Sequence, residues 1–515
     1  MAEPVTAQDA EPLIRPDDEH NRRLVENVHP PGWVNPEPTG RYHLLALGAG
    51  TAGLVSAIGA AGLGARAALV ERHLMGGDCL NVGCVPSKAV IRAARAWHEV
   101  RTAAGRFGAP PADTAGGGTF AAVMERMRRL RADISKVDSA HRFAAAGVEV
   151  HLGEARFVAP DAVEVGGKRL AFRRAVIATG GRATAPPIPG LAEAGYLTNE
   201  TVFELTALPA SLAVIGAGPI GCELAQAFAR FGTEVTLLDV ADQVLIREDR
   251  DAAAIVQEAL ERDGVKLALG VKITRVTGGA GAPVTLELER DGARRTVTVE
   301  RLLVAAGRKP NVEGLGLEAA GVETNKQGVV VDDRLRTTNP RIYAAGDVAG
   351  RWQFTHAADA MARIVIQNAL FFGRKKASDL VIPWCTYTSP EIAHVGMYEH
   401  DAREKGIEID TITLPLEDVD RAKLDGADDG FLRVHVVKGK DRVVGATLVA
   451  EHAGDMLGEL CLAVTAGVGL NAISGVIHPY PTQGEVVKKA ADAWRRGKLT
   501  PLVKTVFGWW FRVFS

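Results

Sequence analysis

Short apolar runs separated by small-residue stretches dominate the first part of the chain. Residues 42–47, 67–70, 212–215 and 234–238 are runs of four to six mostly apolar residues, as expected of strands buried on both faces of a parallel sheet. A glycine-rich turn and then helix-forming residues follow residues 42–47, and the same order follows residues 212–215. The pattern therefore predicts two strand–turn–helix–strand units.

Between these units, residues 119–145 show apolar positions at helical spacing. This spacing predicts one amphipathic helix whose apolar stripe packs into the core. The positions, which recur every three or four residues, are Met124, Met127, Leu130, Ile134 and Val137.

The two ends of the chain follow other patterns. From about residue 382 the strands become longer and alternating, as in residues 431–437 and 443–449, which predicts an antiparallel sheet with flanking helices. Residues 1–40 contain seven prolines, scattered charges and no apolar period. We therefore expect them to form a flexible N-terminal extension.

Length and composition indicate a large multidomain chain. At 515 residues it exceeds the size at which one core stops growing, so three or more domains are expected. A formal net charge of −2 gives no bulk attraction to nucleic acid. No cleavable signal pattern begins the sequence, and its cysteines are too few for an extracellular disulfide framework, so we expect a cytoplasmic protein. The five cysteines are Cys79, Cys84, Cys222, Cys385 and Cys461.

The turn after residues 42–47 has the spacing of a dinucleotide-binding site. Gly48, Gly50 and Gly53 form Gly-x-Gly-x-x-Gly, and Glu71 closes the next strand. These glycines let the backbone approach a pyrophosphate at a helix N-terminus, and the acid can accept hydrogen bonds from ribose hydroxyls. The motif alone could be a merely tight turn, but the acid at this place favours a nucleotide.

The same arrangement occurs a second time. Gly216, Gly218 and Gly221 form the turn, with Ile220 inside it, and Asp239 stands as far from its first glycine as Glu71 does from Gly48. Two such units predict two dinucleotides, which suits an electron relay.

Two cysteines, Cys79 and Cys84, stand five positions apart at the entrance of a predicted helix. The helix dipole should lower the pKa of Cys84 there. In a regular helix such positions are about 8–9 Å apart, beyond the ~7 Å limit for a disulfide, so a bond needs a distorted turn. Gly76, Gly77 and Gly83 supply the backbone freedom. We interpret the pair as redox-active; the alternatives are two structural cysteines or half of a zinc site, for which no second pair with ligand spacing occurs in the sequence.

Residues 76–88 read Gly-Gly-Asp-Cys-Leu-Asn-Val-Gly-Cys-Val-Pro-Ser-Lys. This segment resembles the active-site signature of the flavoprotein disulfide reductases, the family of dihydrolipoamide dehydrogenase, glutathione reductase and mercuric reductase. The likeness covers about residues 42–495. It implies that Cys84 faces the flavin as the charge-transfer thiolate and that Cys79 is the interchange thiol that attacks the substrate.

The resemblance also implies the cofactors. The first glycine turn would bind FAD and the second NADH, because Asp239 accepts from a free 2′-hydroxyl and repels a 2′-phosphate; NADPH is the alternative, because Arg247 lies close in sequence. Lys88 would lie near the flavin N5 and pair with Glu223, and Asp347 would bind a ribityl hydroxyl. The further cofactor contacts implied are Gly77, Thr179, Gly180, Gly307, Thr355 and His356.

The predicted fold class is α/β, with two Rossmann-like dinucleotide-binding domains, for FAD and NAD(P), and an α+β C-terminal dimerisation domain. By the resemblance, the protein is a homodimer whose C-terminal segment completes the partner's active site. The expected units are the extension 1–40, the FAD domain 41–187 and 313–381, the NAD(P) domain 188–312, the dimerisation domain 382–498 and an aromatic-basic tail 499–515.

One element departs from the family's common His-Pro-Thr-x-x-Glu pattern. Tyr480 stands where the histidine would be, five positions before Glu485, and His478 is offset by two. A phenol with a pKa near 10 is a poor base at neutral pH, which argues against efficient dihydrolipoamide chemistry. The tyrosine resembles mercuric reductase, but those enzymes end in a vicinal cysteine pair and this sequence has no cysteine after Cys461.

The sequence therefore predicts an enzyme that passes electrons from NAD(P)H through FAD and the Cys79–Cys84 pair to a disulfide or thiol-reactive substrate. The alternatives are a mercuric ion reductase, a diaphorase or quinone reductase that bypasses the thiols, and a low-turnover structural or regulatory flavoprotein. Intact cysteines argue against the last of these.

The end of the chain predicts a contact of its own. Residues 502–514 hold two tryptophans and three phenylalanines beside lysines and arginines. The run is shorter than the ~20 apolar residues that span a bilayer. We expect a peripheral contact with an anionic membrane surface; a groove on the partner subunit is the alternative.

Overall fold

A computed structural model of the chain describes residues 13–110, 118–279 and 281–514. Its first lobe contains a seven-stranded sheet of order β3-β2-β1-β6-β5-β4, with β18 also paired to β6. Strands β1, β2, β3, β6 and β18 run parallel, and β4 and β5 are antiparallel. The strands are β1 (Arg41–Leu47), β2 (Ala67–Glu71), β3 (Val148–Leu152), β4 (Ala155–Ala159), β5 (Ala162–Val165), β6 (Lys168–Ile177) and β18 (Ile342–Ala344).

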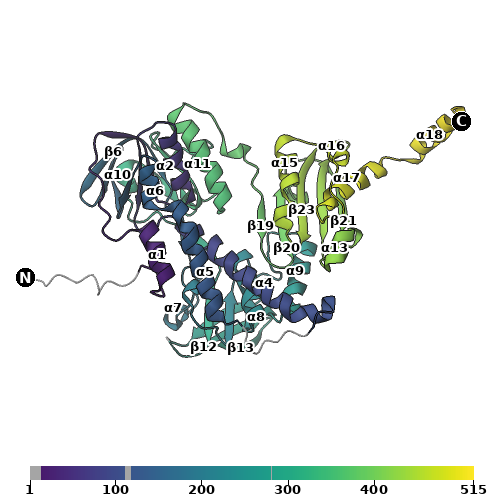
Figure 1. Cartoon of the computed structure of the whole chain (residues 1–515), viewed down its shortest axis with the longest axis horizontal. Coiled ribbons are helices and arrows are strands. Elements are labelled where there is room, and N and C mark those ends of the chain that lie inside the picture. The colour runs from purple at the N-terminus through teal and green to yellow at the C-terminus, as the bar shows by residue number, and fades with distance from the viewer. Residues whose placement is uncertain (1–12, 111–117, 280, 515) are drawn as a thin grey trace, which may run out of the picture.

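Helices α2 (Thr51–Gly62) and α11 (Thr355–Leu370) pack on each other against this sheet (Figure 1). Residues 44–47 of β1 and 67–70 of β2 are buried, whereas Arg41 and His43 of β1 are exposed. Their apolar runs therefore reflect burial on both faces, as the sequence predicted.

A second lobe contains a four-stranded parallel sheet of order β10-β9-β8-β14. A three-stranded antiparallel sheet, β11-β12-β13, lies next to it. The strands are β8 (Ser211–Ile215), β9 (Glu234–Leu238), β10 (Lys266–Ala268), β11 (Lys272–Thr277), β12 (Val284–Arg290), β13 (Ala293–Val299) and β14 (Arg301–Val304).

Two short strands carry the chain between the first two lobes. Strand β7 (Gly181–Ala183) follows β6, and β15 (Arg308–Pro310) follows β14; the two pair antiparallel. The long helix α4 (Cys84–Phe107) of the first lobe packs against α8 (Pro219–Phe231) of the second. The lobes are thus joined both by a strand pair and by packed helices.

The third lobe is a five-stranded antiparallel sheet of order β19-β20-β23-β22-β21. Helices α15 (Gly458–Ala466) and α17 (Glu485–Gly497) pack on it, and α18 (Pro501–Val513) projects away from it (Figure 1). The predicted fold class is confirmed. The strands are β19 (Trp384–Thr386), β20 (Glu391–Gly396), β21 (Ile409–Pro415), β22 (Phe431–Val437) and β23 (Val443–Ala450).

The extension that we expected to be flexible is folded in its described part; its residues 1–12 lie outside the description. Helix α1 (Glu19–Val28) begins at Asp18, whose carboxylate accepts the main-chain N–H of Asn21 at 2.8 Å. Leu24 and Val28 are fully buried in the core of the first lobe. The prediction was wrong because it relied on the prolines of residues 1–40 and overlooked this pair of apolar residues at the i, i+4 spacing of a helix.

The helix predicted over residues 119–145 is interrupted. Helix α5 (Phe120–Ile134) ends in a 3₁₀ turn, and α6 (Ala140–Ala145) follows. Met124 and Met127 are buried as predicted, but Ile134, the last residue of α5, is 45% exposed, and Val137, in the 3₁₀ turn, is 56% exposed.

Arg131 takes an inward position on α5 instead. Its Nη1 donates to the carbonyl of Asn81 at 2.6 Å and its Nη2 to Asn21 Oδ1 at 2.7 Å. Burial lowers the pKa of Arg131 to about 10. The arginine thus links α1 to the segment that contains Cys79.

Because α1 is part of the core, Leu24→Ala should destabilise the protein. We expect a loss of about 2–5 kcal/mol in unfolding free energy, as for other fully buried leucines, measured by denaturant unfolding. Glu26→Ala, at an exposed position of the same helix, is the matched control and should change stability by about 0.5 kcal/mol or less. Equal effects of the two substitutions would contradict the packing of α1.

Candidate functional site

The first glycine turn is shaped to bring a ligand against the backbone. Gly48 has φ +97°, and a Cβ there would lie 2.4 Å from the carbonyl oxygen of Ala178. A Cβ on Gly53 would lie 1.8 Å from the carbonyl oxygen of Gly48. Gly50 begins α2 without a side-chain cap, so its N–H groups are open to an anion. The turn therefore fits a dinucleotide pyrophosphate.

The second turn repeats this geometry. Gly216 has φ +106°, and a Cβ on Gly221 would lie 1.8 Å from the carbonyl oxygen of Gly216. Gly218 begins α8, again without a side-chain cap, and Ile220 is 38% exposed at its first turn.

The two acids also correspond. Glu71 Oε2 accepts the N–H of Ala49 at 2.7 Å, and Asp239 Oδ2 accepts the N–H of Ala217 at 2.6 Å. Each carboxylate lies at the end of its strand and fixes the turn that precedes it. Carboxylate oxygens have further lone pairs, so both acids can also accept from a ribose hydroxyl.

The helical backbone is interrupted between Cys79 and Cys84, where the sequence predicted a distorted turn. Cys79 lies in the short helix α3 (Gly77–Asn81), and Cys84 is the first residue of α4. Gly76 and Gly77 have positive φ, and a Cβ on Gly83 would lie 2.8 Å from the carbonyl oxygen of Asp78. Both cysteines are free thiols.

The two thiols are electrostatically unequal. A hydrogen bond from Cys79 lowers the pKa of Cys84 to about 6, with help from Thr355 and the positive charge of Lys88, and against burial and Glu223. Cys84 Sγ lies 3.4 Å from Thr355 Oγ1, at the start of α11. The same pairing raises the pKa of Cys79. At neutral pH the reduced pair therefore carries its negative charge on Cys84 and its proton on Cys79.

The predicted ion pair beside the thiols is present. Lys88 Nζ lies 2.7 Å from Glu223 Oε2 and 4.5 Å from the centre of the Tyr387 ring. Glu223 is 6% exposed, and its other oxygen accepts the N–H of Tyr387 at 2.9 Å. Helices α4 and α8 thus fix the ammonium group near Cys84.

The two segments that carry the chain between the first two lobes are bonded to each other. Thr179 Oγ1 donates to the carbonyl of Asn311 at 2.7 Å, and the N–H of Asn311 donates to the carbonyl of Gly180 at 2.9 Å. Gly307, with φ +145°, accepts the N–H of Thr184 at 3.1 Å. Nε2 of the His356 ring lies 2.6 Å from the carbonyl oxygen of Pro383.

Sequence reasoning missed Arg308. This guanidinium pairs with Asp78, next to Cys79, and its Nε lies 3.4 Å from Asp347 Oδ2. Burial raises the pKa of Asp347 although Arg308 opposes this. No local motif signals these contacts, because the three residues lie far apart in the sequence.

The C-terminal candidates lie in the third lobe. Tyr480 is 70% exposed, and its hydroxyl donates to Asp420 Oδ2 at 3.0 Å. His478 Nε2 lies 2.9 Å from Glu459 Oε2, and Glu485 begins α17. Among the described residues, no hydrogen bond or ion pair joins these side chains to α3 or α4 of the same chain.

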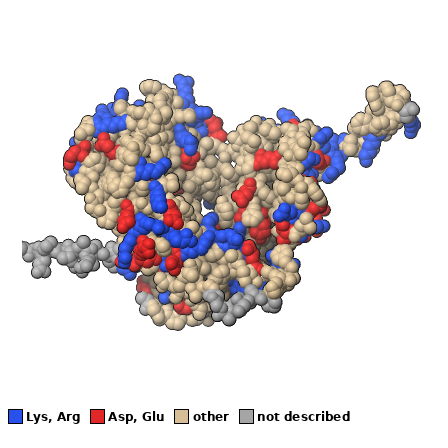
Figure 2. Space-filling view, in the orientation of Figure 1, with Lys and Arg blue, Asp and Glu red and all other residues tan. Residues whose placement is uncertain are grey.

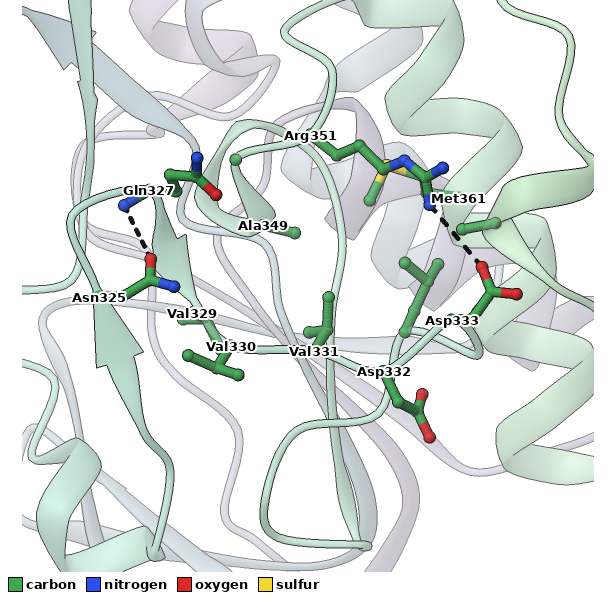
Figure 3. Close-up of a pocket in the computed structure, with 13 residues that line it drawn as sticks. Asn325, Gln327, Val329, Val330, Val331, Asp332, Asp333, Ala349, Arg351 and Met361 are labelled. Atoms are coloured by element: carbon green, nitrogen blue, oxygen red, sulfur yellow. Dashed lines mark hydrogen bonds and ion pairs between the residues drawn. The ribbon is translucent and has the colours of Figure 1, made fainter. Parts of the chain in front are cut away.

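A cavity of about 510 Å³ lies behind the first lobe's site, between the loop that precedes β18 and helix α11. Figure 3 shows Arg351 directed toward Asp333 across it, at 3.7 Å. Asp333 also accepts from Ser378, and Asp332 from Arg336. The two aspartates of this cavity are thus already paired with neighbouring side chains, and its lining contains none of the predicted site residues.

Two dinucleotide turns, a polarised thiol pair at a helix entrance and a third antiparallel domain together define a flavin- and nicotinamide-dependent disulfide oxidoreductase. The chain belongs to the pyridine nucleotide-disulphide oxidoreductase family: the family model matches residues 42–362 and the dimerisation-domain model residues 382–491. Members depend on FAD with NAD(P)H as electron donor, and the dimerisation domain indicates a homodimer.

Similar proteins include mercuric reductases and dihydrolipoyl dehydrogenases. Mercuric reductase of Bacillus cereus is 37% identical to this chain, and the match covers 89% of this chain and 72% of the relative. Mercuric reductase of Streptomyces lividans is 36% identical, and the match covers 88% of this chain and 96% of the relative. Dihydrolipoyl dehydrogenase of Thermus scotoductus is 34% identical, and the match covers 88% of this chain and 97% of the relative. Among solved structures, the HOCl-induced flavoprotein disulfide reductase RclA of Escherichia coli matches with a TM-score of 0.77 and 29% sequence identity. The match covers 88% of this chain and 99% of that structure's chain.

The Cys84 thiolate gives a pH-dependent prediction. Its pKa is lowered, so the charge-transfer absorbance of the NADH-reduced holoenzyme should be present at pH 7 and disappear as the pH falls through about 6. Thr355→Val should move this midpoint upward by about one pH unit, since a hydrogen bond to a charged group contributes about 1.5–3 kcal/mol and one pKa unit is 1.36 kcal/mol. Thr355→Ser keeps the hydroxyl and should titrate like the wild type; a shift of the same size in both variants would contradict the role of the hydroxyl.

Proposed function

We propose that this protein takes electrons from NADH and delivers them through the Cys79–Cys84 pair to a disulfide or another thiol-reactive substrate. The observation that carries the proposal is the polarised pair: a thiolate on Cys84 beside Lys88, and a protonated thiol on Cys79. NADH is favoured over NADPH because Asp239, at the end of β9, would repel a 2′-phosphate.

When bound, FAD would supply the two-electron chemistry that links a nicotinamide to the disulfide, and Glu71 and Asp347 are among the residues that would hold it. Lys88 and Thr355 stabilise the Cys84 thiolate that results. Cys79 attacks one sulfur of the substrate, which forms a mixed disulfide and releases one thiol. Cys84 then attacks Cys79 and releases the second thiol, and the Cys79–Cys84 bond is restored.

Proton transfer limits which substrate suits this site. Cys79 must lose its proton before it attacks, and its pKa is raised by the adjacent Cys84. By the family resemblance, Tyr480 of one protomer serves the Cys79 of the other. The hydrogen bond to Asp420 raises the pKa of Tyr480 further, so the phenol stays protonated at neutral pH and is a poor base for the Cys79 proton.

Reduction of Hg(II) is the second candidate function. Thiols bind such a soft cation as thiolates and release their protons on coordination, so a strong protein base is not needed at Tyr480. Relatives named mercuric reductase at 35–37% identity support this candidate. The sequence has no cysteine after Cys461, so any delivery of the metal would differ from that by a vicinal C-terminal pair.

A substrate panel tests both candidates. We expect NADH oxidation by the holoenzyme with at least one of glutathione disulfide, lipoamide or Hg(II) thiolates, and a loss of about 100-fold or more in Cys79→Ser and Cys84→Ser, because covalent catalysis needs the thiols. Reduction of a quinone by the flavin should survive both substitutions. Turnover with quinones alone, equal in all three proteins, would instead establish the diaphorase alternative.

We also propose that α18 contacts an anionic membrane surface. None of its residues is buried, and Trp509 and Phe511 are 65% and 67% exposed. Lys504 and Arg512 are eight positions apart, so they share one narrow face of the helix while apolar residues cover the remainder.

The surroundings of α18 add positive charge. From residue 493 to residue 514 the chain has five lysines and arginines and no acid. Figure 2 shows basic side chains where α17 meets α18 and along the projecting helix. No helix in the described part of the chain is long and apolar enough to cross a bilayer. An amphipathic helix of this kind lies in the plane of the headgroups.

Deletion of residues 500–515 should remove co-sedimentation with vesicles that contain phosphatidylserine. Neutral phosphatidylcholine vesicles should bind the full-length protein more weakly, because the attraction depends on anionic lipid. Size-exclusion chromatography of the same deletion provides the control. If the deletion dissociates the dimer, or if the full-length protein binds no vesicles, then α18 is not a membrane contact.

A further inference from the structure

The short helix α3 is held at both of its ends by arginines from other segments. Arg131 of α5 bonds the carbonyl of Asn81 at its C-terminal end at 2.6 Å. Arg308 of β15 pairs with Asp78 at its N-terminal end. Cys79 lies between these two anchors, so their positions determine where its sulfur lies.

Arg308 differs from Arg131 because it also joins the lobes. Its strand pairs with β7, and its Nη2 donates to the carbonyl of Gly181 at 2.8 Å. Its Nε faces Asp347, the residue that the family resemblance assigns to the flavin ribityl chain, at 3.4 Å. The guanidinium is 16% exposed. One side chain therefore touches the inter-lobe strands, the flavin-side acid and the helix of the interchange thiol.

We propose that Arg308 is a positioning residue for Cys79, which it holds against Cys84 by fixing Asp78 to the β7–β15 strand pair. A guanidinium suits this role, because its planar fork bonds several oxygens at fixed angles, whereas an ammonium group acts as a point charge. The inference rests on the proposed function, in which Cys79 is the interchange thiol. It adds that the exit strand of the second lobe sets the geometry of the thiol pair.

Loss of this anchor has a defined consequence for the thiols. Without Arg308, Asp78 is left without its cation, and α3 loses its tie to the β7–β15 strand pair. Leu80 stays packed in the core, and the N–H of Gly76 stays bonded to the carbonyl of Ala49 at 2.8 Å. Cys79 then moves more freely relative to Cys84, and their hydrogen bond weakens. Since that bond is the main cause of the low pKa of Cys84, the thiolate becomes less stable and Cys79 becomes more reactive toward small reagents.

Arg308→Met in the holoenzyme tests the proposal. We expect the pH midpoint of the charge-transfer absorbance to rise, and alkylation of Cys79 by iodoacetamide in the NADH-reduced protein, compared at equal bound FAD, to accelerate about 10-fold. Arg308→Lys should give an intermediate shift. Arg182→Met is the matched control: Arg182 lies in β7 and pairs with Glu313 at 2.9 Å, in the same strand pair but without contact to α3.

A second variant, Asp78→Asn, breaks the same contact from the other side if Arg308→Met folds poorly. The double variant should be no worse than the more affected single variant, since both remove one interaction. Additive effects, equal effects of Arg182→Met and Arg308→Met, or an unchanged alkylation rate would overturn the proposal. The alkylation and absorbance measurements need no substrate, so failure of the proposed function would show separately, as a wild type without thiol-dependent turnover.

Discussion

The redox site depends on one interruption of the backbone, between α3 and α4. A continuous helix would hold Cys79 and Cys84 about 8–9 Å apart, too far for a disulfide. The interruption lets the two thiols act on each other, which lowers the pKa of Cys84, and it makes Cys84 the first residue of a 24-residue helix. Gly83 is required there, because a Cβ would lie 2.8 Å from the carbonyl oxygen of Asp78. Gly83 therefore permits both a disulfide bond between Cys79 and Cys84 and the thiolate of Cys84 at the start of α4.

The charges around this interruption come from four segments of the chain. Lys88 stabilises the thiolate, but Glu223 pairs with it and limits the effect. Arg308 and Arg131 do not touch the sulfurs; they fix the two ends of α3. The electrostatic elements and the positioning elements are thus separate side chains. This arrangement lets the lobes that bind two different nucleotides meet at one pair of thiols.

Features that depend on neighbours in sequence were predictable, and features that depend on distant contacts were not. The glycine turns follow from local steric rules. The sequence alone therefore predicted the turns at Gly48 and Gly216 together with their acids, Glu71 and Asp239. Helix α1 was missed because its evidence was a single buried pair, Leu24 and Val28, in a proline-rich stretch. Arg308 was missed because its partners, Asp78 and Asp347, come from remote positions, and a lone arginine carries no local signal.

The position of the proton in the reduced pair connects structure to substrate. Stabilising the thiolate on Cys84 places the remaining proton on Cys79, the sulfur that must attack. A histidine near its usual pKa of about 6.5 could remove that proton at neutral pH, but Tyr480, bonded to Asp420, holds its own. Under the proposed function, the site therefore suits substrates that displace the thiol proton themselves, such as soft metal ions, better than it suits the oxidation of a dithiol.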